Sequence, residues 1–121
     1  MKTKGLLLVV AIILSVVEQT ADAQLIGGVG VLRGAKGAGS VPVFVDAKAL
    51  DAYYEANARN DYEDGMTELF NAGKLYMVDV GTKVRVLGAP DFFGSTREIR
   101  ILEGEFKGRR GFIPSQWISE K

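Results

Sequence analysis

The chain has 121 residues, 47% of them hydrophobic and 25% charged, which is an ordinary composition for one globular domain. It contains no cysteine and no histidine, which excludes disulfides, thiol nucleophiles and thiolate metal sites, and removes the commonest general base and zinc ligand. Fifteen basic residues balance fifteen acidic ones, so the chain has no net charge with which to attract nucleic acid.

Residues 1–23 have the order of a secretory signal peptide. Lys2 and Lys4 precede an apolar run, and a polar stretch then leads to the small residues Ala21 and Ala23. The apolar run is shorter than the roughly 18 to 20 residues needed to span a bilayer as a helix. We expect cleavage after Ala23 and an exported protein, periplasmic or extracellular, without a permanent membrane span. An uncleaved anchor is the alternative.

Residues 24–40 are rich in glycine and have no sustained hydrophobic period. Glycine at this density is costly to order, which indicates a flexible linker or a frayed terminus ahead of a domain at residues 41–121. The domain is expected to begin with a strand, because residues 41–45 (VPVFV) are β-branched or aromatic. Pro42 favours the edge or the start of that strand.

A helical insertion is predicted at about residues 46–73. Asp46 is a suitable N-cap, and Ala47, Leu50 and Tyr54 follow at helical spacing. A second helix is expected to begin at Asn60 or Asp61 and to end near Gly73. Its apolar stripe favours core contacts rather than a cofactor site, and it comprises Tyr62, Met66, Leu69 and Phe70.

After Gly73 the hydrophobic period falls to two residues. In TKVRVLG and REIRILEG, apolar residues alternate with charged ones, which predicts half-buried antiparallel strands. The stretches APDFFGS and EGEFKGRRG have the composition of turns, and RGFIP is a further strand ended by Pro114. We therefore expect a mainly β fold, a small curled sheet or barrel, whose buried residues are Val84, Val86, Ile99, Ile101, Ile113 and Ile118.

The segments VDVGTKVRVLG and GRRGFIPSQWI resemble the Src-homology-3 (SH3) family and its extracytoplasmic bacterial relatives, over about residues 74–119. The resemblance implies a five-stranded, partly open SH3-like barrel, here with the two helices inserted after its first strand. It also implies a groove that holds an extended peptide against aromatic rings. This chain lacks the family's acidic, tyrosine-bearing first loop, and its groove tryptophan would fall near Glu98 or Arg100. Recognition of Pro-x-x-Pro ligands is therefore not expected.

Strand alternation places Phe112 and Pro114 on the outer face, and the turn that follows brings Trp117 beside them. We expect a ligand-binding surface here, completed by Phe92 and Phe93 and rimmed by the remaining candidates, Arg110 and Gln116. The alternative is that the helices cover this groove and that Trp117 belongs to the core.

Other sites find little support in the sequence. The acidic run at residues 61–68 does not match a calcium loop, because its third and twelfth positions would be Tyr62 and Asn71. No pair of carboxylates stands out from surface charge as in a glycosidase. The basic turn at residues 107–110 could meet an anionic cell-wall polymer or an acidic partner, or be merely solvated.

The sequence therefore predicts an exported, non-catalytic binding or adaptor module, with no cofactor and no metal, whose partner is a protein, a peptide or a cell-wall component. The alternative is a small secreted inhibitor or structural protein that acts through the helical insertion.

Overall fold

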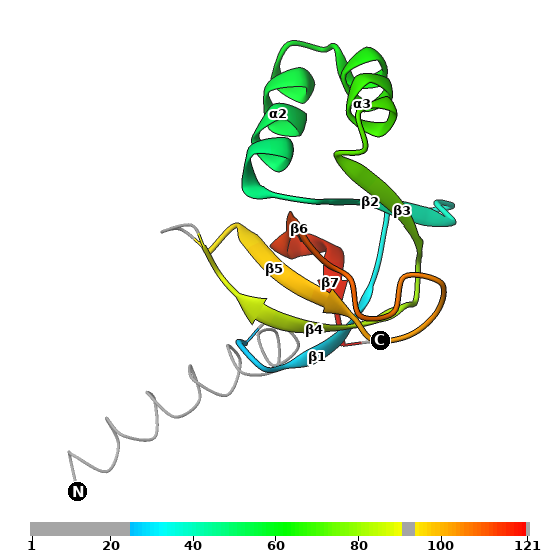
Figure 1. Cartoon of the computed structure of the whole chain (residues 1–121), viewed down its shortest axis with the longest axis vertical. Helices are drawn as coiled ribbons and strands as arrows, with labels where there is room; N and C mark the ends of the chain where they lie inside the picture. The colour runs from blue at the N-terminus through cyan, green and yellow to red at the C-terminus, as the bar shows by residue number, and fades with distance from the viewer. Residues whose placement is uncertain (1–24, 91–93, 121) are drawn as a thin grey trace, which may run out of the picture.

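A computed structural model describes residues 25–90 and 94–120. The predicted signal peptide lies outside these residues. The described part is mainly β: seven antiparallel strands form one sheet in the order β3-β2-β6-β5-β4-β1-β7, and two helices stand against one end of it (Figure 1). The strands are β1 Val29–Leu32, β2 Ser40–Phe44, β3 Leu75–Asp79, β4 Lys83–Gly88, β5 Thr96–Ile101, β6 Arg110–Pro114 and β7 Ile118–Ser119. The helices are α2 Ala47–Ala58 and α3 Tyr62–Asn71, and a short 3-10 turn, η2, covers Ser115–Trp117.

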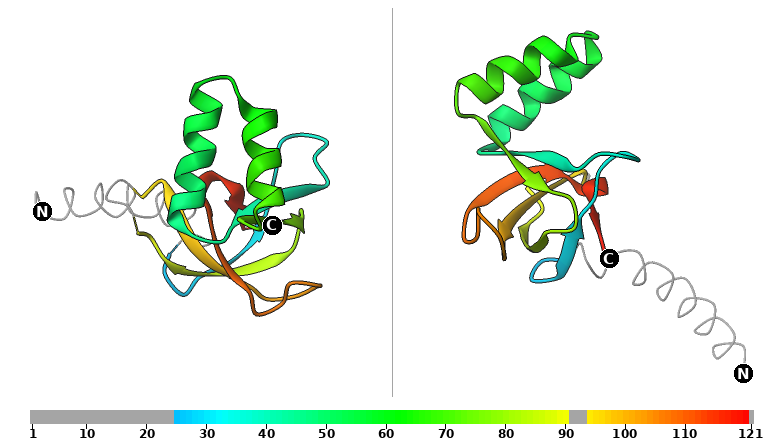
Figure 2. Two further views of the ribbon diagram at one scale, coloured as in Figure 1. Left: turned by 45° about the horizontal axis from the view of Figure 1, so that its top comes forward. Right: turned by 90° about the vertical axis from the view of Figure 1, so that its right-hand side faces the viewer.

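The sheet is curled, as the views in Figure 2 show. Its larger core cluster takes at least one buried side chain from every one of the seven strands, so all seven present one face to the same core. The six inward residues expected from the alternating pattern are all confirmed in this cluster, and none is more than 3% exposed. The alternating pattern therefore predicted correctly which side chains of β4, β5, β6 and β7 point into the core.

The sheet has more strands than the five expected. Val29–Leu32 pairs with both β4 and β7, although this segment lies within the stretch expected to be a flexible linker. Leu32 is fully buried, and packing of this kind offsets the entropy cost of the neighbouring glycines. β2, expected as the first strand, is consequently the second, and the two helices follow the second strand.

The two helices, residues 47–58 and 62–71, lie within the stretch 46–73 that was expected to be helical. The Asp46 carboxylate accepts a hydrogen bond from the Ala49 backbone N–H at 2.8 Å, which caps α2. After α3, Gly73 has a φ of +72°, the left-handed conformation that commonly ends a helix. The two helices lie close together because Gly65 has no side chain: a Cβ there would come within 2.5 Å of Ala56 Cβ.

A second, smaller cluster lies on the outer face of the sheet. Phe44 and Leu75 point outward from β2 and β3, and Ala49 and Leu50 of α2 bury them. α2 is therefore anchored by fully buried side chains. α3 has no fully buried residue, but Met66 and Leu69 of its expected apolar stripe pack against this cluster, whereas Tyr62 and Phe70 are exposed.

Candidate functional site

The joint between the helices and the sheet is aromatic. The ring of Tyr53 on α2 lies 5.2 Å from the Phe44 ring and 5.9 Å from the Trp117 ring, measured between centroids. The rings of Tyr54 and Tyr62 lie 5.5 Å and 5.8 Å from the Tyr53 ring. These separations and tilted geometries are those of favourable aromatic pairs. Tyr53 is therefore the centre of a cluster that links both helices to the sheet.

Two of the predicted site residues belong to this cluster. Phe112 on β6 pairs across the strands with Phe44, and both Phe112 and Trp117 pack against the outer cluster while remaining half-buried. We call Tyr53, Tyr54, Phe112 and Trp117 the aromatic surface. The helices thus cover part of the expected groove and contribute rings to what remains of it.

The other predicted residues are placed differently. Pro114, expected on the outer face, is buried; it pairs with Thr96, itself buried, on β5, just before η2. Gln116 and Arg110 are exposed, as expected for a rim. Phe92 and Phe93 lie outside the described residues.

Trp117 has a structural role in addition to its place on the surface. It packs against both the larger core cluster and the outer cluster, so it lies between them. The alternative that Trp117 belongs to the core is therefore correct for the part of its ring that packs inward. Truncation of Trp117 is expected to loosen the fold, so that Tyr54, which is 37% exposed, is the cleaner probe of the surface.

A row of arginines crosses the sheet beside the aromatic surface. Arg85 pairs with Arg100, and Arg100 pairs with Arg110, on the exposed side of three adjacent strands. Like charges directly opposite one another destabilise a sheet. The acid nearest to this row is Glu98, whose carboxylate lies 3.8 Å from the Arg110 guanidinium. The sequence predicted Arg110 as a rim residue, but the row itself depends on strand register and was missed.

Charge is divided between the two parts of the molecule. Residues 46–73 carry seven acidic and two basic side chains, whereas the remaining described residues carry ten basic and five acidic ones. The helical hairpin is therefore negative and the remaining described residues, which include the sheet, are positive, although the whole chain is neutral. An anionic ligand is attracted to the sheet and a cationic one to the hairpin.

Two tyrosines have altered acidity. Burial, and to a smaller extent the neighbouring Tyr62 and Tyr54, raise the pKa of Tyr53. Burial also raises the pKa of Tyr76, and this is opposed by Arg109, whose guanidinium carbon lies 4.1 Å above the Tyr76 ring. The Tyr76 hydroxyl donates to the Arg110 carbonyl oxygen at 2.9 Å, which fixes the start of β6.

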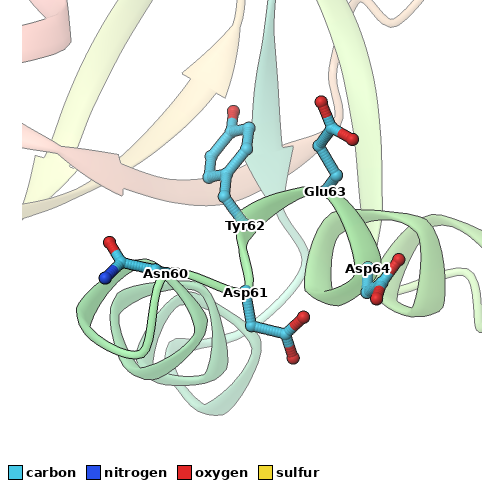
Figure 3. A pocket seen from close by; sticks show the side chains of 5 residues that line it. All are labelled: Asn60, Asp61, Tyr62, Glu63 and Asp64. Carbon is cyan, nitrogen blue, oxygen red and sulfur yellow. The ribbon is translucent and has the colours of Figure 1, made fainter.

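The turn between the helices forms an open hollow lined by residues 60–64 (Figure 3). Figure 3 shows that the Glu63 carboxylate points to the opposite side of the turn from that of Asp61. Among the described residues, no group of three or more acidic side chains is arranged to hold a metal ion. The acidic run instead includes Glu63 and Asp64 in the first turn of α3, where carboxylates stabilise a helix.

A second apolar groove lies on the hairpin side of the sheet edge. Its volume is about 300 Å³, and its walls are Tyr62, Met66, Thr67 and Phe70 of α3 and Leu75 and Met77 of β3. We call it the β3 groove. Tyr62 borders both this groove and the aromatic surface. The sequence pattern identified the α3 stripe but gave no sign that it would face a strand edge.

Comparisons with protein-family models, with curated proteins and with solved structures find no match for this chain. Within residues 25–90 and 94–120, the structure contains no helix with the length and apolar character that a membrane crossing requires.

Proposed function

We propose that this protein is an exported, non-catalytic binding or adaptor module that holds a peptide, protein or cell-wall ligand on the aromatic surface. The observation that carries the proposal is the meeting of Phe112 and Trp117 from the closing segment with Tyr53 and Tyr54 from α2 at one partly exposed place. Aromatic rings of this kind supply most of the binding energy at interfaces.

We further propose that the barrel is SH3-like. Several features support this: β4, β5 and β6 are sequential antiparallel neighbours, η2 separates β6 from the last strand, and β1 pairs with both β4 and β7. The seven strands would then comprise a five-stranded barrel, in which β2 and β3 are the two arms of an extended first loop and the helical hairpin forms its tip. Contact of β2 with β6 at one residue pair is compatible with this arrangement.

The arginine row gives the ligand a chemical character. It begins at Arg110, two residues along β6 from Phe112, on the same side of the sheet. A ligand that lies on the aromatic surface and extends over β5 and β4 would meet three guanidinium groups. We therefore propose that the ligand carries carboxylate or phosphate groups beside an apolar portion.

The test uses binding of the purified protein to purified peptidoglycan sacculi by cosedimentation, and to a phage-displayed random peptide library. Tyr54→Ala should weaken binding of the selected ligand by about 30-fold, which corresponds to an aromatic anchor worth roughly 2 kcal/mol. Phe70→Ala, which truncates an exposed ring in the β3 groove, is the matched control and should bind normally. Equal loss in both variants, or no loss in Tyr54→Ala, contradicts the proposal.

Export has a separate test. We propose that the protein leaves the cytoplasm after cleavage following Ala23, since residues 1–23 have the charge, apolar and small-residue order of a signal peptide. The intact mass of the protein recovered from an exported fraction should correspond to a chain that starts at Gln24. Recovery of the uncleaved chain in membranes would contradict cleavage.

A second candidate function is a small secreted inhibitor or structural protein that acts through the helical insertion. The observation in its favour is that α3 buries none of its apolar side chains fully within the described residues. Tyr62 is 43% exposed and Phe70 57% exposed, so the helix presents an apolar surface to a partner.

A further inference from the structure

β3 is an edge strand. Within residues 25–90 and 94–120, the outward backbone groups of Leu75 and Met77 make no backbone hydrogen bond, whereas the Asp79 carbonyl accepts one from the Thr82 N–H at 3.2 Å. The Val45 N–H donates to the Lys74 carbonyl and the Val80 N–H donates to the Gly39 carbonyl, each at 3.0 Å. In an antiparallel ladder the paired residues alternate, so Tyr76 and Val78 also face β2. The N–H and C=O groups of Leu75 and Met77 therefore point away from the sheet, toward the open edge at the end of the strand order.

This edge carries no lysine, proline or bulge, although the turn at residues 103–106 adjoins its Asp79 end. Edge strands are commonly blunted by lysine, proline or a bulge, but β3 has the sequence LYMVD and pairs with β2 in continuous register. Pro42 is on β2, opposite Met77, at a position where no hydrogen bond to β3 is required. Leu75 and Met77 therefore offer backbone N–H and C=O groups with which a further strand can pair.

The β3 groove lies directly beside this edge. Leu75, Met77 and Asp79 alternate with the inward residues Tyr76 and Val78, so they share the outer face on which α3 stands (Figures 1 and 2). In an added antiparallel strand, the residues opposite Leu75 and Met77 would place their side chains on that same face. Those side chains would enter the groove and contact Met66 and Phe70.

The other end of the edge is acidic. A smaller hollow of about 50 Å³ adjoins Met77, and its lining includes Asp79, Glu103 and Glu105. The nearby hairpin also carries a large excess of carboxylates. A hollow of this size suits the head group of one basic side chain, which would lie opposite Asp79 and two positions from the first apolar residue.

We infer that β3 and α3 bind an extended peptide by strand addition, and that the peptide has the pattern basic-x-apolar-x-apolar, written from its N-terminus. The order follows from antiparallel pairing, since the peptide residue opposite Asp79 precedes those opposite Met77 and Leu75. This inference rests on the second candidate function and is independent of the aromatic surface.

A second copy of the chain fits this edge less well. Self-pairing about Met77 would place Asp79 of each copy opposite Leu75 of the other, an acidic side chain against an apolar one. It would also bring together two hairpins that each carry five more acidic than basic side chains. The charges therefore favour a cationic peptide over a dimer.

The test measures fluorescence anisotropy of a labelled synthetic peptide, TKTVTITG, with the full chain. The valine of this peptide is expected to pair with Met77 and to donate its backbone N–H to the Met77 carbonyl oxygen. A matched peptide that is N-methylated at the valine cannot make this hydrogen bond and should bind at least about tenfold more weakly. A peptide with glutamate in place of the lysine should also bind about tenfold more weakly, and added salt should reduce the difference in affinity between the lysine and glutamate peptides.

Protein variants locate the site. Phe70→Ala should weaken binding of the peptide by about tenfold, and Asp79→Asn should weaken it and reduce its salt dependence. Tyr54→Ala should leave it unchanged, so failure here is distinguishable from failure of the aromatic surface. Equal binding of the N-methylated peptide overturns strand addition. Sedimentation that shows a dimer disrupted by Phe70→Ala, with no peptide binding, overturns the peptide in favour of a second copy.

Discussion

Gly111→Ala is expected to destabilise the protein because β6 and β2 approach closely at this residue. A Cβ at Gly111 would overlap Val43 Cγ1, and it would lie 2.9 Å from the Phe44 carbonyl oxygen and 3.1 Å from the Tyr76 hydroxyl. The carbonyl belongs to the backbone, and the hydroxyl is held by its hydrogen bond to Arg110. The overlap can therefore be relieved only if β6 moves away from β2. This movement would separate Phe44 from Phe112, which belongs to the aromatic surface.

Overpacking of a core usually costs about 1 to 3 kcal/mol, and we expect about 3 kcal/mol here because two of the three obstructing groups cannot rotate away. With a typical urea slope, this lowers the unfolding midpoint by roughly 1 to 3 M. Urea unfolding can be followed by the fluorescence of Trp117, the only tryptophan in the chain.

Gly39→Ala is the matched control. A Cβ at Gly39 would meet no atom within 4 Å, and its φ is not positive, so the substitution should be neutral or stabilising by about 0.4 to 1 kcal/mol. Combining Gly111→Ala with Val43→Ala removes the closest contact, so the double variant should lose less stability than the two single losses added together. If Gly111→Ala and Gly39→Ala unfold at the same urea concentration, the close approach of β2 and β6 is wrong.

Two further predictions concern charge. Because the pKa values of Tyr53 and Tyr76 are raised in the folded protein, their contribution to stability is fully present below the ordinary tyrosine pKa of about 10 and is lost as pH rises through the folded values. Unfolding measured at increasing alkaline pH should show this decline, and Tyr76→Phe should make it smaller; an unchanged decline would contradict the assignment to Tyr76. Arg100→Thr should stabilise the sheet by about 0.2 to 1 kcal/mol, more at low salt, because it removes like charges opposite Arg85 and Arg110. A loss of stability in Arg100→Thr at low salt would show that the row is not repulsive.

Local pattern was sufficient to predict the buried faces of four strands and two of the residues at the ends of the helices, Asp46 and Gly73. Alternation fixes the face of each strand, so Ile99 and Ile113 could be placed inside without knowing their partners. The Asp46 cap and the Gly73 ending likewise depend on short-range chemistry. These features need no information about the path of the chain between them.

The features that were missed depend on contacts between distant segments. β1 lies among glycines and is ordered because Leu32 enters the core and Val31 pairs with Ser119 near the other end of the chain. Pro114 is buried where it pairs with Thr96 on a separate strand. The arginine row and the β3 groove likewise require strand register and the position of α3, which composition and periodicity do not specify.

Trp117 fluorescence reports directly on ligand binding at the aromatic surface, because the single tryptophan of the chain lies there, 5.9 Å from the Tyr53 ring. The protein would be titrated with the tightest ligand selected from the peptide library or released from sacculi. We predict a saturable change in Trp117 emission, with the same dissociation constant as an independent binding measurement and a roughly 30-fold weaker one for Tyr54→Ala. Emission that stays unchanged while the independent measurement reaches saturation would place the ligand elsewhere and contradict the account.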